Sequence, residues 1–222
     1  MKSIIKCLII GVVLLCPLLT YAQTNEERSN KSITYGIKTG VGLSSVLVKG
    51  REFYEGKKIG LVLGGFVRYR ISESMVLQPE LLFVRKGEEA EWVLYGGDIG
   101  SNGVASSYIV TRDHKLSYIT IPINIYAKVS DKFNVLFGVE PSFLYSEKNI
   151  TVVNGEEFED LFNLYGGVRK MDVGLNLGLN YEMSKTLSLD LKLNQGIIKL
   201  NKEGGSNVYN SSVQLTMGYA LN

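Results

Sequence analysis

The feature that most constrains this chain is an alternation of apolar and polar residues that continues through most of the sequence after residue 32. In the stretch ITIPINIYAK, residues 119–128, every odd position is apolar. Successive side chains of a β-strand point to opposite faces, so a period of two predicts strands. The pattern predicts eight of them, over residues 33–48, 58–71, 74–86, 115–129, 132–146, 168–183, 186–200 and 208–221.

The connections between these segments alternate in length. Short turns at 71–74, 129–132 and 183–186 join three pairs of segments, whereas longer polar or glycine-rich stretches join the others. The longest of these runs from 87 to 114, and we expect it to be a loop containing the short strands EWVLY and SSYIV with a glycine turn between them. An up-and-down meander with tight turns at one end and loops at the other is typical of outer-membrane barrels.

Two closed architectures fit the pattern, and they differ in which face is inside. A soluble lipocalin-like barrel points its apolar face inward, whereas a membrane barrel points it at lipid. The odd positions are bulky and free of charge over the central part of each segment, while the even positions are rich in glycine. An eight-stranded barrel has a narrow interior, so the small residues belong inside. The even positions also carry charges of both signs in nearly equal number, as a confined interior requires.

Aromatic residues also favour the membrane barrel. A group on the odd face lies near the short-turn end, and a second group lies near the loop end, as the two interfacial girdles of a membrane barrel require. The first group is Tyr35, Tyr69, Phe133, Tyr181 and Tyr219, and the second is Phe83, Phe143 and Tyr145. The sequence therefore predicts an all-β fold, an eight-stranded antiparallel up-and-down transmembrane β-barrel. Pro79, Pro122 and Pro141 each remove a ladder donor from it, and we expect local bulges there.

The first residues predict export. Lys2 and Lys6 precede an apolar run over 7–19, which is too short to span a membrane, and Ala22 is a suitable cleavage site. We expect a signal peptide at 1–22, a flexible periplasmic leader at 23–32 and the barrel at 33–222, in the outer membrane. Lipid attachment at Cys16 is less favoured because of its neighbours Leu15 and Pro17.

Charge and cysteine content exclude other classes. Both cysteines lie in the signal, so the mature chain has no disulfide. The full chain has 24 basic and 22 acidic residues, and loss of the two signal lysines brings the net charge to zero, which gives no indication of nucleic-acid binding.

The even-position charges suggest a salt-bridge network that plugs the barrel, because water channels belong to larger barrels. The candidates are Lys38, Arg68, Glu80, Glu140, Asp172, Asp190 and Lys192. The alternative is a conduction path, which would make the protein a narrow porin or transporter for small solutes.

No residue pattern indicates an enzyme, a cofactor or a metal site. His114 is the single histidine, and Asp113 and Ser117 are too close in sequence to complete a triad on a strand, so we expect a solvated loop histidine. Asp98 and Asn102 lack the further acidic residues of a calcium site. If the loops recognise a protein or glycan, Trp92 and Tyr95 are plausible exposed anchors.

Four stretches resemble the outer-membrane β-barrel proteins of Bacteroidota that are called porin-family or PorT-like: LQPELLF at 77–83, LSYITIPINIYAK at 116–128, FGVEPSFLY at 137–145 and the hairpin at 174–196. The resemblance implies an eight-stranded barrel with a structural or interaction role, and it allows a role in protein secretion. Expected partners are outer-membrane lipid and the barrel-assembly machinery. The chain departs from the pattern in ending MGYALN, where such barrels commonly end on an aromatic residue.

Overall fold

The computed structural model describes residues 33–48, 56–99, 105–159, 167–202 and 207–221. The predicted signal peptide and leader lie outside this part of the chain. Among the described residues there is no helix long and apolar enough to cross a membrane. The described part contains ten strands: β1 (Ile33–Val48), β2 (Lys58–Arg70), β3 (Met75–Ile99), β4 (Ala105–Thr120), β5 (Ile123–Lys128), β6 (Phe133–Val153), β7 (Glu156–Glu159), β8 (Met171–Glu182), β9 (Leu187–Gly196) and β10 (Val208–Ala220).

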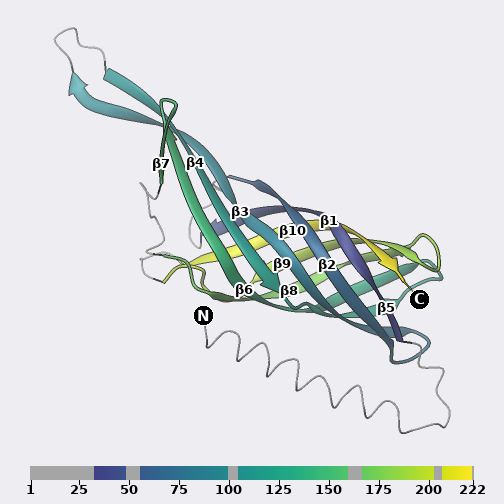
Figure 1. The fold of residues 1–222 in the computed structure, drawn as a ribbon. Coiled ribbons are helices and arrows are strands. Elements are labelled where there is room, and N and C mark those ends of the chain that lie inside the picture. Colours follow the sequence, from purple (N-terminus) through teal and green to yellow (C-terminus); the bar gives the residue numbers. More distant parts are fainter. Residues whose placement is uncertain (1–32, 49–55, 100–104, 160–166, 203–206, 222) are drawn as a thin grey trace. The chain divides into compact units, whose positions relative to one another are not determined.

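These strands form a closed antiparallel ring (Figure 1). The order of the strands around the ring follows their order in the chain, and β1 closes the ring by pairing with β10, from Gly36 opposite Ala220 to Val48 opposite Val208. β4 and β5 are two parts of one wall, since both lie between β3 and β6, and β7 only extends β6 as a hairpin. The described residues therefore make a ring of eight strands, which confirms the predicted up-and-down barrel.

The prolines do not cause the expected bulges. Leu82 is opposite Thr120 and Pro79 is opposite Ile123, so the register of β3 is the same on both sides of Pro122. The Pro122 carbonyl still accepts from the Glu80 backbone N–H at 2.9 Å, so the wall loses only the donor that proline lacks. The bulge near the loop end is at Tyr145 instead, where Ser117 pairs with Ser146 but Tyr118 pairs with Leu144.

The two faces of the ring differ as the alternation predicts. On β8, the side chains of Leu175, Leu177 and Leu179 are 50–57 % exposed, whereas Asn176 and Asn180 between and beside them are buried. The same apolar exposure continues around the ring and gives it an apolar outer belt. Glycine makes room inside: a methyl group at Gly36 would lie 2.5 Å from the Phe66 ring. The large aliphatic residues face outward, and the glycines leave space in the narrow interior for larger side chains such as Phe66.

The main departure from the sequence-based prediction lies beyond the barrel, at the end away from the C-terminus (Figure 1). Residues 87–99 and 105–114 are not a loop with two separate short strands, because β3 and β4 run continuously through them and stay paired from Leu82–Thr120 to Tyr95–Ser107. β6 accompanies β4 as far as Val153, and β7 adds to β6. We call these continuations of β3, β4 and β6, together with β7, the extracellular sheet, since the short turns of such barrels face the periplasm.

Candidate functional site

The barrel interior holds one group of paired charges near the short-turn end. Lys38 of β1 donates to Glu80 of β3 and, at 2.7 Å, to Asp190 of β9. The hydroxyl of Tyr126 lies 3.1 Å from the same Asp190 carboxylate, which also accepts from Asn180 at 2.6 Å. Each of the three charged side chains is at most 4 % exposed. Three strands that are distant in sequence therefore meet at a single ammonium group.

A second group lies closer to the loop end. Glu140 of β6 is fully buried and accepts from Lys86 of β3 at 3.1 Å and from Lys192 of β9 at 2.8 Å. A buried carboxylate is strongly disfavoured unless cations and donors compensate it, and here each oxygen has its own lysine. This arrangement ties β6 to two other strands of the ring.

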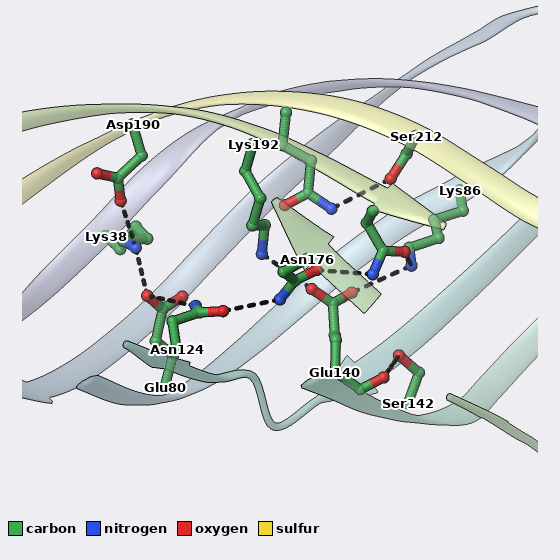
Figure 2. Close-up of polar contacts among 12 residues, drawn as sticks. Lys38, Glu80, Lys86, Asn124, Glu140, Ser142, Asn176, Asp190, Lys192 and Ser212 are labelled. Atoms are coloured by element: carbon green, nitrogen blue, oxygen red, sulfur yellow. Dashed lines mark hydrogen bonds and ion pairs between the residues drawn. The ribbon is translucent and has the colours of Figure 1, made fainter. Parts of the chain in front are cut away.

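A chain of side-chain amides joins the two groups (Figure 2). Asn194 accepts from Lys86 at 2.9 Å and donates to Asn176, and Asn176 donates to Asn124 at 2.9 Å. Asn124 in turn lies 3.4 Å from Glu80. Because each amide offers both a donor and an acceptor, the chain transmits hydrogen bonding across the interior without adding charge.

The other two candidates lie beside these groups and bond to neutral partners. Arg68 donates to Gln78 at 2.6 Å and to Ser188 at 2.9 Å, and its guanidinium lies 5.0 Å from the centre of the Phe66 ring. Asp172 accepts from Asn210 at 2.8 Å. The structure thus brings five of the seven candidates into ion pairs and leaves Arg68 and Asp172 next to them.

Lys86 is a charge of the barrel interior that is not among the candidates predicted from the sequence. It occupies an even position, and that parity is the signal that could have identified it, but it is the last residue of its predicted segment. Once Lys86 is added, the set of candidate charges in the barrel interior is balanced. It has four positive side chains, Lys38, Arg68, Lys86 and Lys192, and four negative ones, Glu80, Glu140, Asp172 and Asp190.

An apolar cluster lies at the loop end of the interior. Its members come from β1, β4, β10 and the segments that flank β8 and β9: Val46, Leu116, Tyr118, Val168, Leu200 and Val208. All are at most 3 % exposed, and Leu144 packs against them. The charged groups therefore lie beneath a layer of hydrocarbon and aromatic side chains.

The inner face of the extracellular sheet carries the residues that the sequence placed in a loop. His114 is not solvated: it is 2 % exposed, and its Nε2 lies 3.2 Å from Glu147. The reason is that β4 continues, so His114 keeps the inward parity of Leu116 and Tyr118. Arg112 forms a buried ion pair with Glu88.

Trp92 is also not a free anchor, because it is only partly exposed and its ring lies 6.0 Å from the Arg112 guanidinium. Tyr95 pairs with Ser107, and its side chain lies outside the described part, as do those of Asp98 and Asn102. The described residues contain no group of three or more His, Cys, Asp or Glu that could hold a metal ion.

A closed antiparallel ring with an apolar outer belt and a paired polar interior defines a β-barrel of the membrane-spanning class. The chain belongs to the family described as "Outer membrane protein beta-barrel domain", whose model matches residues 21–202. Membership confirms the predicted outer-membrane barrel and its location. The family is defined by this barrel and not by a catalytic activity, in agreement with the prediction that the protein is not an enzyme.

Solved structures of outer-membrane proteins are similar to the chain. Neisserial surface protein A is 12 % identical, with 85 % of this chain and 99 % of that one covered and a TM-score of 0.50, which supports the fold. Ail of Yersinia pestis, solved with the heparin analogue sucrose octasulfate, is 12 % identical over 86 % of this chain and 99 % of its own, with a TM-score of 0.48. OprG from Pseudomonas aeruginosa is 12 % identical over 86 % and 97 %, with a TM-score of 0.40. A search of curated proteins finds no match.

Proposed function

We propose that this protein is a non-conducting outer-membrane barrel whose role is to hold an extracellular sheet at the cell surface, where the sheet contacts a protein or glycan. The filled interior is the observation that carries the proposal. Charges on β1, β3, β6 and β9 are paired across the barrel, and the apolar cluster lies above them.

The energetics of the interior favour a plug. A permeating ion would have to displace the lysines from Glu140 or the carboxylates from Lys38, and each step would leave a buried charge without its partner. It would also have to pass the apolar cluster, which offers no charged ligand. An ion that permeates the open channel of a larger barrel meets neither obstacle.

The lengths of β3 and β6 support the proposed role of the extracellular sheet. β3 has 25 residues and β6 has 21, whereas a membrane-spanning strand needs roughly 9–11. The extra length is paired sheet and not irregular loop, so it presents a fixed surface. The outward face of that sheet carries exposed acidic residues, namely Glu89, Glu91, Glu157 and Glu159. A cationic protein segment is the partner whose charge complements this face.

Planar-bilayer recording tests the plug. The purified protein should give little conductance under conditions in which a 16-stranded porin gives stable open channels. Large stable channels from the unmodified protein would contradict the proposal and favour the narrow-porin alternative.

The proposal includes an origin in Bacteroidota and membership of the PorT-like proteins. That membership is the basis of the alternative function, a role in protein secretion. Affinity purification after gentle cross-linking separates the two roles. Enrichment of secretion components with the full-length protein would favour the secretion alternative, whereas their absence together with capture of a surface partner supports the proposal.

A further inference from the structure

The outward face of the extracellular sheet changes charge in steps with distance from the apolar belt. The lipid-facing positions end at Phe83, Ile119 and Phe143, which are neighbours across β3, β4 and β6. The next outward positions are Arg85, Ser117 and Ser146, two residues further along β3 and β4 and three along β6 because of the bulge at Tyr145. The step after that brings Gly87, Lys115 and Lys148 into register. Arg85 and both lysines are exposed. We call Arg85, Lys115 and Lys148 the basic row.

Acidic residues follow immediately beyond the basic row. The next step outward has Glu89 opposite Asp113, and Asp113 opposite Ile150, which in turn faces Glu159 of β7. One step further are Glu91 and Glu157, paired with Thr111 and Val152. The positive charge is therefore confined to the level next to the membrane, although the sheet as a whole is acidic on this face.

Lys115 and Lys148 are direct cross-strand partners. Like charges at opposed positions destabilise a sheet, so this pair needs an anion to compensate it. Lys115 contacts Asp113 at 2.8 Å, but that carboxylate is shared with Lys58. The local balance is four cations, Lys58, Arg85, Lys115 and Lys148, against two carboxylates, Asp113 and Glu89, which leaves a net charge of about +2 on the surface.

The basic row is also in contact with the apolar belt. The Arg85 guanidinium lies 6.0 Å from the centre of the Phe83 ring, and Tyr145, at the bulge beside this row, is 75 % exposed. A ligand held here would contact cations with its head and hydrocarbon or aromatic surface with its body. That combination belongs to an amphipathic anion, and a soluble phosphate would use only half of it.

We propose that Arg85, Lys115 and Lys148 form a binding surface for the phosphate groups of a phosphorylated glycolipid of the outer leaflet. The guanidinium of Arg85 offers a planar fork for two phosphate oxygens, and the two lysines act as point charges. The acyl chains then lie along the apolar belt below Phe83 and Phe143. The inference rests on the membrane location of the barrel, and it holds whether or not the interior conducts.

The test is a titration of the full protein, in a neutral detergent, with lipid A, with dephosphorylated lipid A and with inorganic phosphate. Binding is measured by native mass spectrometry and by the midpoint of the heat-induced shift in gel mobility. We expect lipid A to raise the midpoint and to bind at least tenfold more tightly than its dephosphorylated form. Equal effects of the two lipids would overturn the proposal, as would an equal effect of inorganic phosphate.

A charge-reversal variant localises the effect. Lys148→Glu should weaken lipid A binding at least tenfold, yet without lipid its midpoint should be no lower than that of the unmodified protein, because the introduced carboxylate would face Lys115. Lys185→Glu makes the same charge change in the short turn at the opposite end and should bind lipid A normally. Lys148→Gln removes the charge with less perturbation and should give an intermediate loss. If Lys148→Glu and Lys185→Glu bind alike, the basic row is not the site. Because bilayer conductance is a separate measurement, either proposal can fail alone.

Discussion

β3, β4 and β6 pass through two environments, and comparing their two halves shows what each environment selects. Within the barrel their outward residues are apolar, such as Leu81, Phe137 and Val139, and their inward residues are amides and paired charges. In the extracellular sheet the outward residues include charged ones such as Arg85, Lys115 and Lys148, while the inward ones include Val110 beside Arg112 and His114. Strand pairing continues through both halves, and the backbone changes at the boundary only by the bulge at Tyr145, so the main difference lies in the side chains.

The difference also concerns the value of an ion pair. In the barrel interior, charges are removed from water on all sides and are supported by one another. At the outward face of the extracellular sheet, Asp113, Lys115 and the neighbouring Lys58 of β2 keep part of their exposure to solvent. Removal of one partner therefore costs more where the contact is enclosed, because the other charge stays buried without compensation, and less where water can solvate it.

The largest expected effect comes from removing the shared carboxylate of the interior. Glu140→Ala leaves Lys86 and Lys192 facing each other without their anion, and we expect a loss of about 3–5 kcal/mol in the free energy of unfolding. The measurement is urea unfolding in lipid vesicles, followed by gel mobility. Glu147→Ala is the matched control in the extracellular sheet, where the carboxylate is 36 % exposed, and it should cost less than about 1 kcal/mol. Equal costs would mean that enclosure does not distinguish the two regions.

A smaller effect is expected from placing one charge on each outward face. Leu177→Arg puts a cation in the middle of the apolar belt and should cost about 2–4 kcal/mol. Ile109→Arg makes the same change at a side chain of nearly equal exposure, 55 % against 57 %, in the extracellular sheet and should be within about 0.5 kcal/mol of neutral. The same unfolding assay compares them. A similar cost for both would show that lipid does not surround Leu177.

The smallest effect concerns acid. Burial raises the pKa of Asp113, but hydrogen bonds from Lys115 and Lys58 outweigh it and hold the pKa below its ordinary value of about 4. A carboxylate with a lowered pKa stabilises the fold fully above its unfolded pKa and loses that contribution as the pH falls through the folded value. Protection of β4 amides from hydrogen exchange should therefore decrease below about pH 4, by an amount equivalent to less than about 1 kcal/mol. Asp113→Asn should have the lower protection already at neutral pH and should lack this step; an unchanged step would assign it to another group.

The sequence was sufficient to predict the barrel because three signals describe the part of each strand within the membrane. They are the period of two, the glycines of the interior and the aromatic girdles of the outer face. The sequence was insufficient for the extracellular sheet for a physical reason. At Arg85, Lys115 and Lys148 the outward residues become charged, and a pattern defined by apolar odd positions ends there although the strands do not. The bulge at Tyr145 then shifts the parity of β6, so Glu147 faces inward and Lys148 outward, and nothing in the local sequence marks that shift.

The candidate network was predictable in composition but not in connection. Parity alone selects Lys38, Glu80, Glu140, Asp190 and Lys192 as inward residues. Which of them meet depends on the tilt and stagger of strands that are up to 152 residues apart, as Lys38 and Asp190 are. The amide chain of Asn124, Asn176 and Asn194 has the same dependence, because a buried asparagine is recognised as a bridge only when both of its neighbours are known.

The position of Lys38 has a consequence for how the barrel is assembled. Its strand, β1, is the first of the described strands and β10 is the last, and their pairing is the seam that closes the cylinder. Lys38 bonds to Glu80 on one side of that seam and to Asp190, on β9, on the other. While the seam is open, Asp190 and Lys38 belong to opposite edges of a curved sheet and cannot meet. Their ion pair therefore depends on closure of the seam, and it stabilises the closed cylinder relative to any state in which β1 and β10 are apart.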